Sequence, residues 1–292
     1  MSLTGSRFAA LTWRWDNWWF GGRDPRNAAL LRIGYAVLCL WQVLELWPDR
    51  HMLLGRPGLM PVALRDDAWH HVSAFAWFDD PTPLLVVWSL AAVLLAAGVL
   101  SRLSMLVCWF FVLSVSFRGG AFTDGSDALM RVFGLYMLFL EVGTTWSVDA
   151  WWRRRRGLQV ADVVSGWPLR LMLLNLCILY VKTGLIKAPN SAWFEGTAVF
   201  YALSSPTFWR FDLFELLQQG WVQTWSVGMT YATLVFEIGF PLVLFRRFRH
   251  PWLLFGLAMH GGVIAFMNLG LFTPAVLWVY LAIVELPKRK AP

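Results

Sequence analysis

Two lysines in one apolar stretch are the side chains best suited to chemistry. Lys182 lies within the stretch 168–187, and Lys187 lies at its end. A lysine that is partly desolvated there can act as a general base, whereas the structural alternative is a side chain that extends to the lipid headgroups. Five residues of helix separate the two lysines by about 140° around the axis, so we expect them to serve different surroundings.

Two carboxylates in other apolar stretches, Glu141 and Glu237, are candidate partners for Lys182. A buried amine either pairs with such a carboxylate or loses its proton. Glu195 follows Lys187 by eight residues and is the nearest acidic residue after it in sequence. The sequence therefore offers several acid–base pairs without choosing among them.

A histidine in the middle of an apolar stretch is the next candidate. His260 is followed directly by Gly261 and Gly262, which allow neighbouring helices to approach closely. The ring can be a structural group that is hydrogen-bonded between helices. Alternatively, it can transfer a proton or contact a carbonyl of a bound ligand.

Asp127 and Arg131 are four residues apart, so they lie on one face of a helix and can form an ion pair. Ionisable residues inside a membrane are costly and usually face a partner or a water-filled cavity. The pair is therefore either a self-contained structural contact or part of an outward-facing pocket.

The sequence gives only a weak indication of a metal site. Asp66 and His70, and likewise Asp67 and His71, are four residues apart, but nothing nearby completes a set of four ligands. We predict no metal site. The three cysteines lie in apolar stretches without a CxxC pair, and we expect buried packing for each of them: Cys39, Cys108 and Cys177.

The elements that must position these residues are apolar and long. Hydrophobic residues make up 58% of the chain, which contains 20 tryptophans. This composition leaves too little polar surface for a soluble domain. A crossing needs about 20 residues, so the two shortest stretches leave a six-span alternative open. We predict an all-α polytopic membrane protein, a bundle of about eight transmembrane helices near 28–47, 82–100, 103–117, 127–146, 168–187, 221–244, 251–269 and 273–286.

Arginine and lysine clusters fall beside alternate ends of these stretches, notably at 153–156 and 246–249. The positive-inside rule then places both termini in the cytoplasm, with the chain multi-pass in the inner (plasma) membrane. We divide the chain into an interfacial N-terminal segment 1–27, a transmembrane domain 28–286 and a cytoplasmic basic tail 287–292. The basic residues border apolar spans, so we expect membrane lipids, and not nucleic acid, as their partners.

The longer loops lie on the outer side, and one of them resembles a helix start. Ser205 followed by Pro206 is typical of a helix N-terminus, and aromatic and charged residues alternate after it. We therefore predict an interfacial helix over 205–217 on the outer leaflet.

The segment Tyr180-Val-Lys-Thr-Gly184-Leu-Ile-Lys187, followed by Trp193-Phe-Glu-Gly196, resembles the signature of HTTM-domain proteins, the bacterial relatives of vitamin K-dependent gamma-carboxylase. The resemblance runs from about residue 28 to about residue 286. The order and spacing of the motifs are more specific than any one of them. Four further pieces fit in the same order: Gly58-Leu-Met-Pro61, Asp124-Gly-Ser-Asp127 leading to Arg131, Trp146-Ser-Val-Asp149, and His260 through Phe272.

The resemblance implies a compact helical bundle with an outward working face and a quinone or hydroquinone as cofactor. In the carboxylase, the lysine at the position of Lys187 acts as the base on vitamin K hydroquinone. We accordingly expect Lys187 and His260 to be catalytic. The residues expected around the cofactor are Asp127, Arg131, Trp193 and Glu195.

The chain also departs from the carboxylase. The histidine expected near the start of the fourth span has no counterpart in 123–127, and the chain ends soon after its last span, where the carboxylase continues into a lumenal domain. We therefore do not expect glutamate carboxylation. The competing hypotheses are a protein that binds or acts on an isoprenoid lipid, and a non-enzymatic membrane subunit that assists the maturation or export of a secreted peptide or protein.

Overall fold

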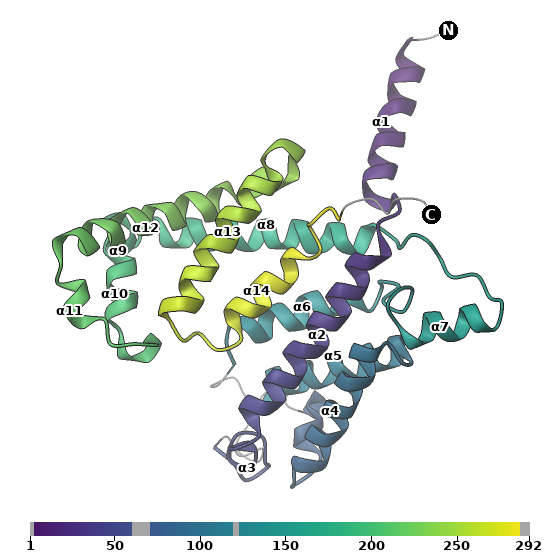
Figure 1. Cartoon of the computed structure of the whole chain (residues 1–292), viewed down its shortest axis with the longest axis horizontal. Helices are drawn as coiled ribbons and strands as arrows, with labels where there is room; N and C mark the ends of the chain where they lie inside the picture. The colour runs from purple at the N-terminus through teal and green to yellow at the C-terminus, as the bar shows by residue number, and fades with distance from the viewer. Residues whose placement is uncertain (1–2, 60–70, 119–122, 287–292) are drawn as a thin grey trace. The chain divides into compact units, whose positions relative to one another are not determined.

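The computed structural model describes residues 3–59, 71–118 and 123–286, and these residues form helices joined by turns (Figure 1). No strand occurs in these ranges, apart from isolated bridges between Arg23 and Val164 and between Trp209 and Met267. The prediction of an all-helical protein is confirmed for this part of the chain. The chain divides into two compact units, residues 1–172 with 274–292 (unit 1) and residues 173–273 (unit 2).

Four segments in the described ranges are long and apolar enough to cross a membrane. They are α2 (Pro25–Leu46), α5 (Ser101–Arg118), α8 (Trp167–Lys187) and the segment 220–244, in which α12 (Gly220–Gly239) continues as the 3-10 helix η5 (Phe240–Leu244). Helix α4 (Thr82–Ala97) is apolar but shorter. The chain is thus a helical membrane protein, with four of the eight expected spans supported by length and composition.

The remaining expected spans differ from prediction. Helix α6 (Gly125–Met137) ends well before residue 146, and turns follow it through the glycine and threonines of 143–145, which are poor helix formers. Helix α14 (Phe272–Tyr280) has only 9 residues. Helix α13 (Arg246–Phe266) is long enough, but it begins with a basic segment. The prediction of a continuous helix over 127–146 was therefore wrong.

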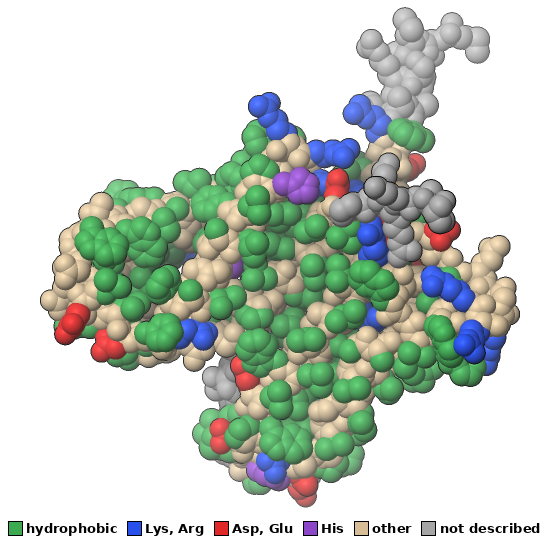
Figure 2. All heavy atoms as spheres, in the orientation of Figure 1, with side chains coloured by type: hydrophobic (Ala, Val, Ile, Leu, Met, Phe, Trp, Pro, Cys, Tyr) green, Lys and Arg blue, Asp and Glu red, His purple; other side chains and the backbone are tan. Residues whose placement is uncertain are grey.

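In unit 1, one face of each apolar helix packs inward and the other is left to the surroundings. On α4, Trp88 is fully buried and its ring stacks 5.7 Å from that of Phe111 on α5, whereas Leu90 and Val93 are exposed. Hydrophobic side chains likewise dominate the face drawn in Figure 2. An apolar exterior over an apolar interior is the pattern expected of a chain whose solvent is lipid.

A fully buried arginine holds the turn after α6 against α2. The Arg32 guanidinium donates to the carbonyl oxygens of Val142 (2.7 Å), Thr145 (3.2 Å) and Trp146 (2.6 Å), and more weakly to Ala96 (3.4 Å) at the end of α4. These carbonyls belong to turns and a helix end, where the backbone cannot supply its own donors. The two terminal nitrogens are therefore satisfied by backbone oxygens, and the side chain links α2 to the end of α4 and to the turns after α6.

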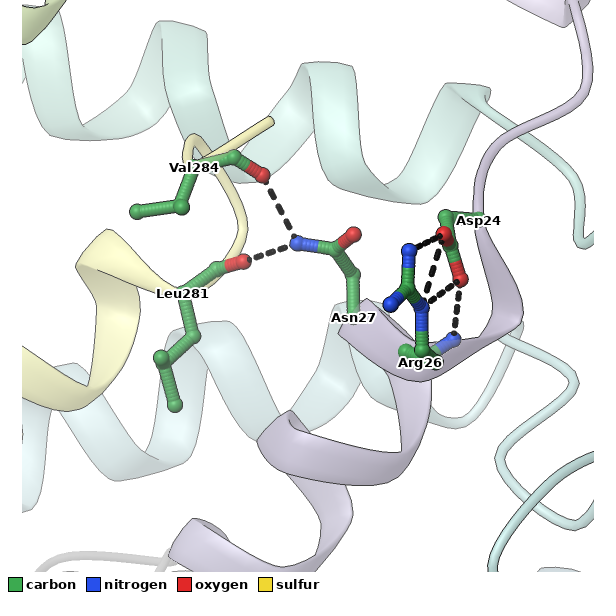
Figure 3. Close-up of polar contacts among 5 residues, drawn as sticks. All are labelled: Asp24, Arg26, Asn27, Leu281 and Val284. Atoms are coloured by element: carbon green, nitrogen blue, oxygen red, sulfur yellow. Dashed lines mark hydrogen bonds and ion pairs between the residues drawn. The ribbon is translucent and has the colours of Figure 1, made fainter. Parts of the chain in front are cut away.

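Side-chain hydrogen bonds also fix the start of α2 (Figure 3). Asp24 caps the helix by accepting from the Arg26 backbone N–H (2.8 Å) and also pairs with the Arg26 guanidinium (2.6 Å). Asn27 donates from Nδ2 to the carbonyl oxygens of Leu281 (2.7 Å) and Val284 (2.9 Å), just past the end of α14. The side chain thus supplies donors to carbonyls that the short helix leaves open.

Further short elements complete unit 1. They are α1 (Leu3–Phe20), α3 (Arg50–Leu53), η3 (Ala74–Ala76) and α7 (Val148–Arg155).

All three cysteines of the chain are free and buried, as predicted: Cys39, Cys108 and Cys177.

Unit 2 does not contain the single interfacial helix expected over 205–217. Residues 206–208 form the 3-10 helix η4 (Pro206–Phe208), and a separate four-residue helix, α11 (Phe214–Leu217), begins after an irregular stretch. Leu203, Leu217 and Val222 form the local core beneath these pieces. Two further short helices precede them, α9 (Ser191–Phe194) and α10 (Ala198–Ser204).

We expect Arg32→Met to lower thermal stability strongly, because each buried carbonyl left without a donor costs about 1–3 kcal/mol. The melting temperature of the purified protein in detergent measures this, and we expect a fall of several degrees or more. Arg102→Met removes an exposed arginine and is the control. Equal melting temperatures for the two variants would contradict the role assigned to Arg32.

Candidate functional site

The candidate site in unit 2 centres on Lys187, the last residue of α8. Its Nζ lies 2.6 Å from Oε1 of Glu237 on α12, and 4.7 Å from the centroid of the Trp193 ring on α9. The ammonium therefore contacts a carboxylate and an aromatic face together. Both are favourable surroundings for a cation.

Two local features bring these groups together. Gly184 lies one turn before Lys187, and a Cβ at that position would lie 2.8 Å from Cγ1 of Ile238 and 3.1 Å from Cβ of Glu237. The missing side chain thus lets α8 approach α12 closely enough for the lysine to reach the carboxylate. After α8, the Asn190 side chain caps α9 by accepting from the Ala192 backbone N–H (3.2 Å), and this short helix carries Trp193.

The two members of the ion pair differ in burial. The Glu237 side chain is 7% exposed, whereas that of Lys187 is 31% exposed. The second carboxylate oxygen of Glu237, Oε2, is buried and accepts no hydrogen bond from any described residue. A buried oxygen of this kind is costly unless a donor reaches it. The site therefore presents a lysine cation, an aromatic face and a buried acceptor that no described residue satisfies.

His260 on α13 lies within an aromatic cluster of the same unit. Its Nε2 is 2.8 Å from the hydroxyl of Tyr180 on α8, and the donor in this bond depends on the histidine tautomer. The Tyr180 ring packs 4.3 Å from Phe240 and 5.1 Å from Phe236, centroid to centroid. Packing of the tyrosine therefore fixes the orientation of the imidazole.

An apolar cavity of about 330 Å³ lies between α10, α12 and α13. Thr233, which lines it, is one helical turn before Glu237, and Met259, which also lines it, is next to His260. Its other lining residues include Trp225, Phe255 and Phe266. The cavity can accommodate an apolar group of moderate size.

The structure separates other predicted residues from Lys187. Lys182 and Glu195 are both exposed, and neither forms an ion pair with a described residue. Glu237 pairs with Lys187 and not with Lys182, contrary to one of the pairings that the sequence left open. Glu141, the other candidate partner of Lys182, accepts from the Ser165 backbone N–H (3.0 Å) in unit 1.

Asp127 and Arg131 belong to unit 1 and do not form the expected ion pair. Asp127 accepts from the Asp124 backbone N–H (2.8 Å) as the second half of the capping box that starts α6, and its other oxygen accepts from Nε2 of Gln42. Trp109 donates to the backbone oxygen of Arg131 (2.8 Å). The capping box forms in place of the ion pair because it satisfies backbone N–H groups that have no partner within the first turn of the helix.

The motif at 146–149 is also structural. Asp149 accepts from the backbone N–H groups of Leu100 (3.0 Å) and Ser101 (2.8 Å), which begin α5. Its carboxylate thus caps a helix that lies far away in sequence.

No group of three or more possible metal ligands occurs in the described ranges. Of the two Asp–His pairs considered from sequence, only His71 is described, and it is exposed. The other three residues, Asp66, Asp67 and His70, lie outside the described part of the chain.

Sequence reasoning missed two features of this site, the partner of Lys187 and the hydrogen bond between Tyr180 and His260. The signal for the first was a lone carboxylate, Glu237, in an apolar span, together with Gly184 one turn before the lysine. Spacing along one helix cannot show which residue of another helix lies opposite it.

The family model described as the HTTM domain matches residues 22–287, nearly the whole chain. No curated protein and no solved structure matches this chain.

We expect Gly184→Val to disrupt the Lys187–Glu237 contact, because the added side chain must displace Ile238 or force the helices apart. Overpacking of this kind costs about 1–3 kcal/mol. Gly228→Val on α12 is the matched control, since a Cβ there meets no atom within 4 Å. The melting temperatures of the two purified variants measure the difference, and an equal loss in both would contradict the close approach.

Proposed function

Since the chain belongs to the HTTM domain family, we propose that this membrane protein binds a quinone or another isoprenoid lipid at Lys187 and acts on that lipid or on a secreted substrate. The observation that carries the proposal is the ion pair of Lys187 and Glu237 under Trp193, with one buried carboxylate oxygen left open. Resemblance to the vitamin K-dependent carboxylases supports the same ligand class.

The residues present fit a hydroquinone. Glu237 Oε2 can accept a hydrogen bond from a ring hydroxyl, and the Lys187 ammonium can donate to a ring oxygen. Trp193 offers an aromatic face to a planar ring. The apolar cavity between α10, α12 and α13 suits an isoprenoid chain, which has no polar group to satisfy.

A bound hydroquinone supplies two electrons and two hydroxyl protons. The residues of the chain orient the hydroquinone and move a proton. The Lys187 ammonium holds the Glu237 carboxylate in one orientation through Oε1, while Oε2 is free to take a proton. Lys187 then compensates the charge that develops beside it. His260, held by Tyr180, is a further hydrogen-bond partner for a ligand in this unit.

We place both termini in the cytoplasm of the plasma membrane, so that the end of α8 with Lys187 faces outward. The basic clusters at 153–156 and 246–249 support this orientation by the positive-inside rule.

Mass spectrometry of lipids extracted from the purified protein tests the function. We expect a stoichiometric quinone with the wild type, and at least a tenfold loss in Lys187→Ala, because a charged hydrogen bond is worth about 1.5–3 kcal/mol. Glu237→Gln should lower the bound amount in the same direction, since it removes the partner of Lys187.

Lys182→Ala is the matched control, because Lys182 lies on the same helix and is exposed. A quinone that is retained in Lys187→Ala, or lost equally in Lys182→Ala, would contradict the assigned site. Circular dichroism and size-exclusion chromatography establish that each variant is folded.

A second function, the handling of a secreted partner, is supported by the surface around α11. Phe211 and Phe214 are 59% and 61% exposed, and Asp212 and Glu215 lie between and beside them. Exposed aromatic residues ringed by charge are typical of protein-binding surfaces. On this hypothesis the chain is a non-enzymatic subunit that assists the maturation or export of a peptide or protein.

We expect Phe211→Ser with Phe214→Ser to abolish the capture of such a partner in a pull-down, because the change removes the exposed aromatic area. The amount of bound lipid should stay the same. Val86→Ser with Val87→Ser, exposed on α4, is the control. Capture that survives the aromatic substitutions would exclude this surface.

A further inference from the structure

Three arginines line one open cavity in unit 1. The cavity has a volume of about 370 Å³, and no described residue that lines it is acidic. Guanidinium groups around one hollow repel one another unless an anion lies between them. Its principal lining residues are Trp13, Arg14, Asn17, Trp18, Arg23 and Arg170.

The arginines come from segments far apart in sequence and are brought together by specific contacts. Arg170, in the first turn of α8, donates from Nε to the Trp18 backbone oxygen (2.9 Å) and lies 4.9 Å over the Trp18 ring. Arg14 lies one turn before Trp18 on α1. Arg23 is held by its backbone bridge to Val164, with N–O distances of 2.9 and 3.0 Å.

Much of the hydrogen-bonding capacity of Arg14 and Arg170 remains for a ligand. A guanidinium has five N–H donors, and Arg170 uses one of them for the backbone of α1. No described carboxylate forms an ion pair with Arg14 or Arg170. The nearby Asp24 is engaged by Arg26 at 2.6 Å. Planar, multidentate donors of this kind are the groups that bind phosphate best.

Exposed aromatic side chains of α1 lie at the cavity or close to it in sequence: Trp13 lines it, and Trp15 and Phe20 lie within two residues of its lining residues. Trp13, Trp15 and Phe20 are 67%, 62% and 64% exposed. In a membrane protein, exposed tryptophans beside arginines belong at the headgroup level, where the ring is half in lipid and the charge is wet. The phosphate most accessible at that depth is that of a phospholipid.

We propose that the cavity formed by Arg14, Arg23 and Arg170 binds the headgroup phosphate of an anionic phospholipid, whose acyl chains lie against the exposed aromatic residues of α1. The site is independent of the proposed quinone function, because it lies in unit 1 and shares no residue with the Lys187 site. It also links the N-terminal helix to the start of α8 through one ligand.

Native mass spectrometry of the full-length protein in detergent tests this proposal. The probes are phosphatidylglycerol, phosphatidylcholine with the same acyl chains, and inorganic phosphate. We expect phosphatidylglycerol to bind about tenfold more tightly than phosphatidylcholine, and millimolar inorganic phosphate to displace little of it. Arg14→Gln should weaken phosphatidylglycerol binding by about tenfold, and Arg14→Gln with Arg170→Gln further, because charge-assisted hydrogen bonds are removed.

The matched control is Arg153→Gln with Arg154→Gln, which removes two exposed arginines of α7 and the same net charge as the double variant. We expect less than a twofold change for it. Arg14→Gln alone keeps the test valid if loss of Arg170 disturbs folding, since the Arg14 side chain is exposed. Equal binding of both lipids, equal effects of the two double variants, or full displacement by inorganic phosphate would overturn the proposal.

Discussion

A polar group in an apolar surrounding must find its partner within the chain, and this requirement governs both units. Water is absent from the bilayer core, so an unsatisfied donor or acceptor there carries its full desolvation cost. Arg32 shows the general solution, because a single buried cation on α2 binds carbonyl oxygens at the end of α4 and in the turns after α6. Asn27 does the same on a smaller scale where α14 ends. The turns that interrupt the apolar elements are thus held by side chains from α2.

The Lys187 site stands out against this background. The other buried or half-buried polar groups described above act in structural contacts: Asp127 and Asp149 cap helices, and the terminal nitrogens of Arg32 bind backbone oxygens. Glu237 instead uses one oxygen for a half-exposed lysine and leaves the other open. A buried carboxylate oxygen without a donor costs free energy, and this oxygen is the observation behind the binding role that we propose for the site.

Much of the architecture was predictable because it depends on long apolar runs. The bounds of α2, α5 and α8 lie within a few residues of the expected stretches, since lipid exposure demands an uninterrupted apolar helix. Elements whose ends depend on local contacts were not predictable. Helix α6 stops at Met137 because Arg32 stabilises the following turns, and 205–217 breaks because its apolar residues pack on a small local core. The choice of Glu237 as the partner of Lys187 required the helix pairing at Gly184, and the same limit applies to Tyr180 and His260.

The place of Lys187 at the very end of α8 has an electrostatic consequence. The carbonyl groups of the last turn point past the helix terminus, and together they carry about half a negative elementary charge that favours a cation. The lysine nitrogen therefore has a second source of electrostatic stabilisation, which belongs to the backbone and does not depend on a side-chain rotamer. Glu237 and the end of α8 thus act on the same cation, the carboxylate through a hydrogen bond and the helix through the field of its backbone carbonyls.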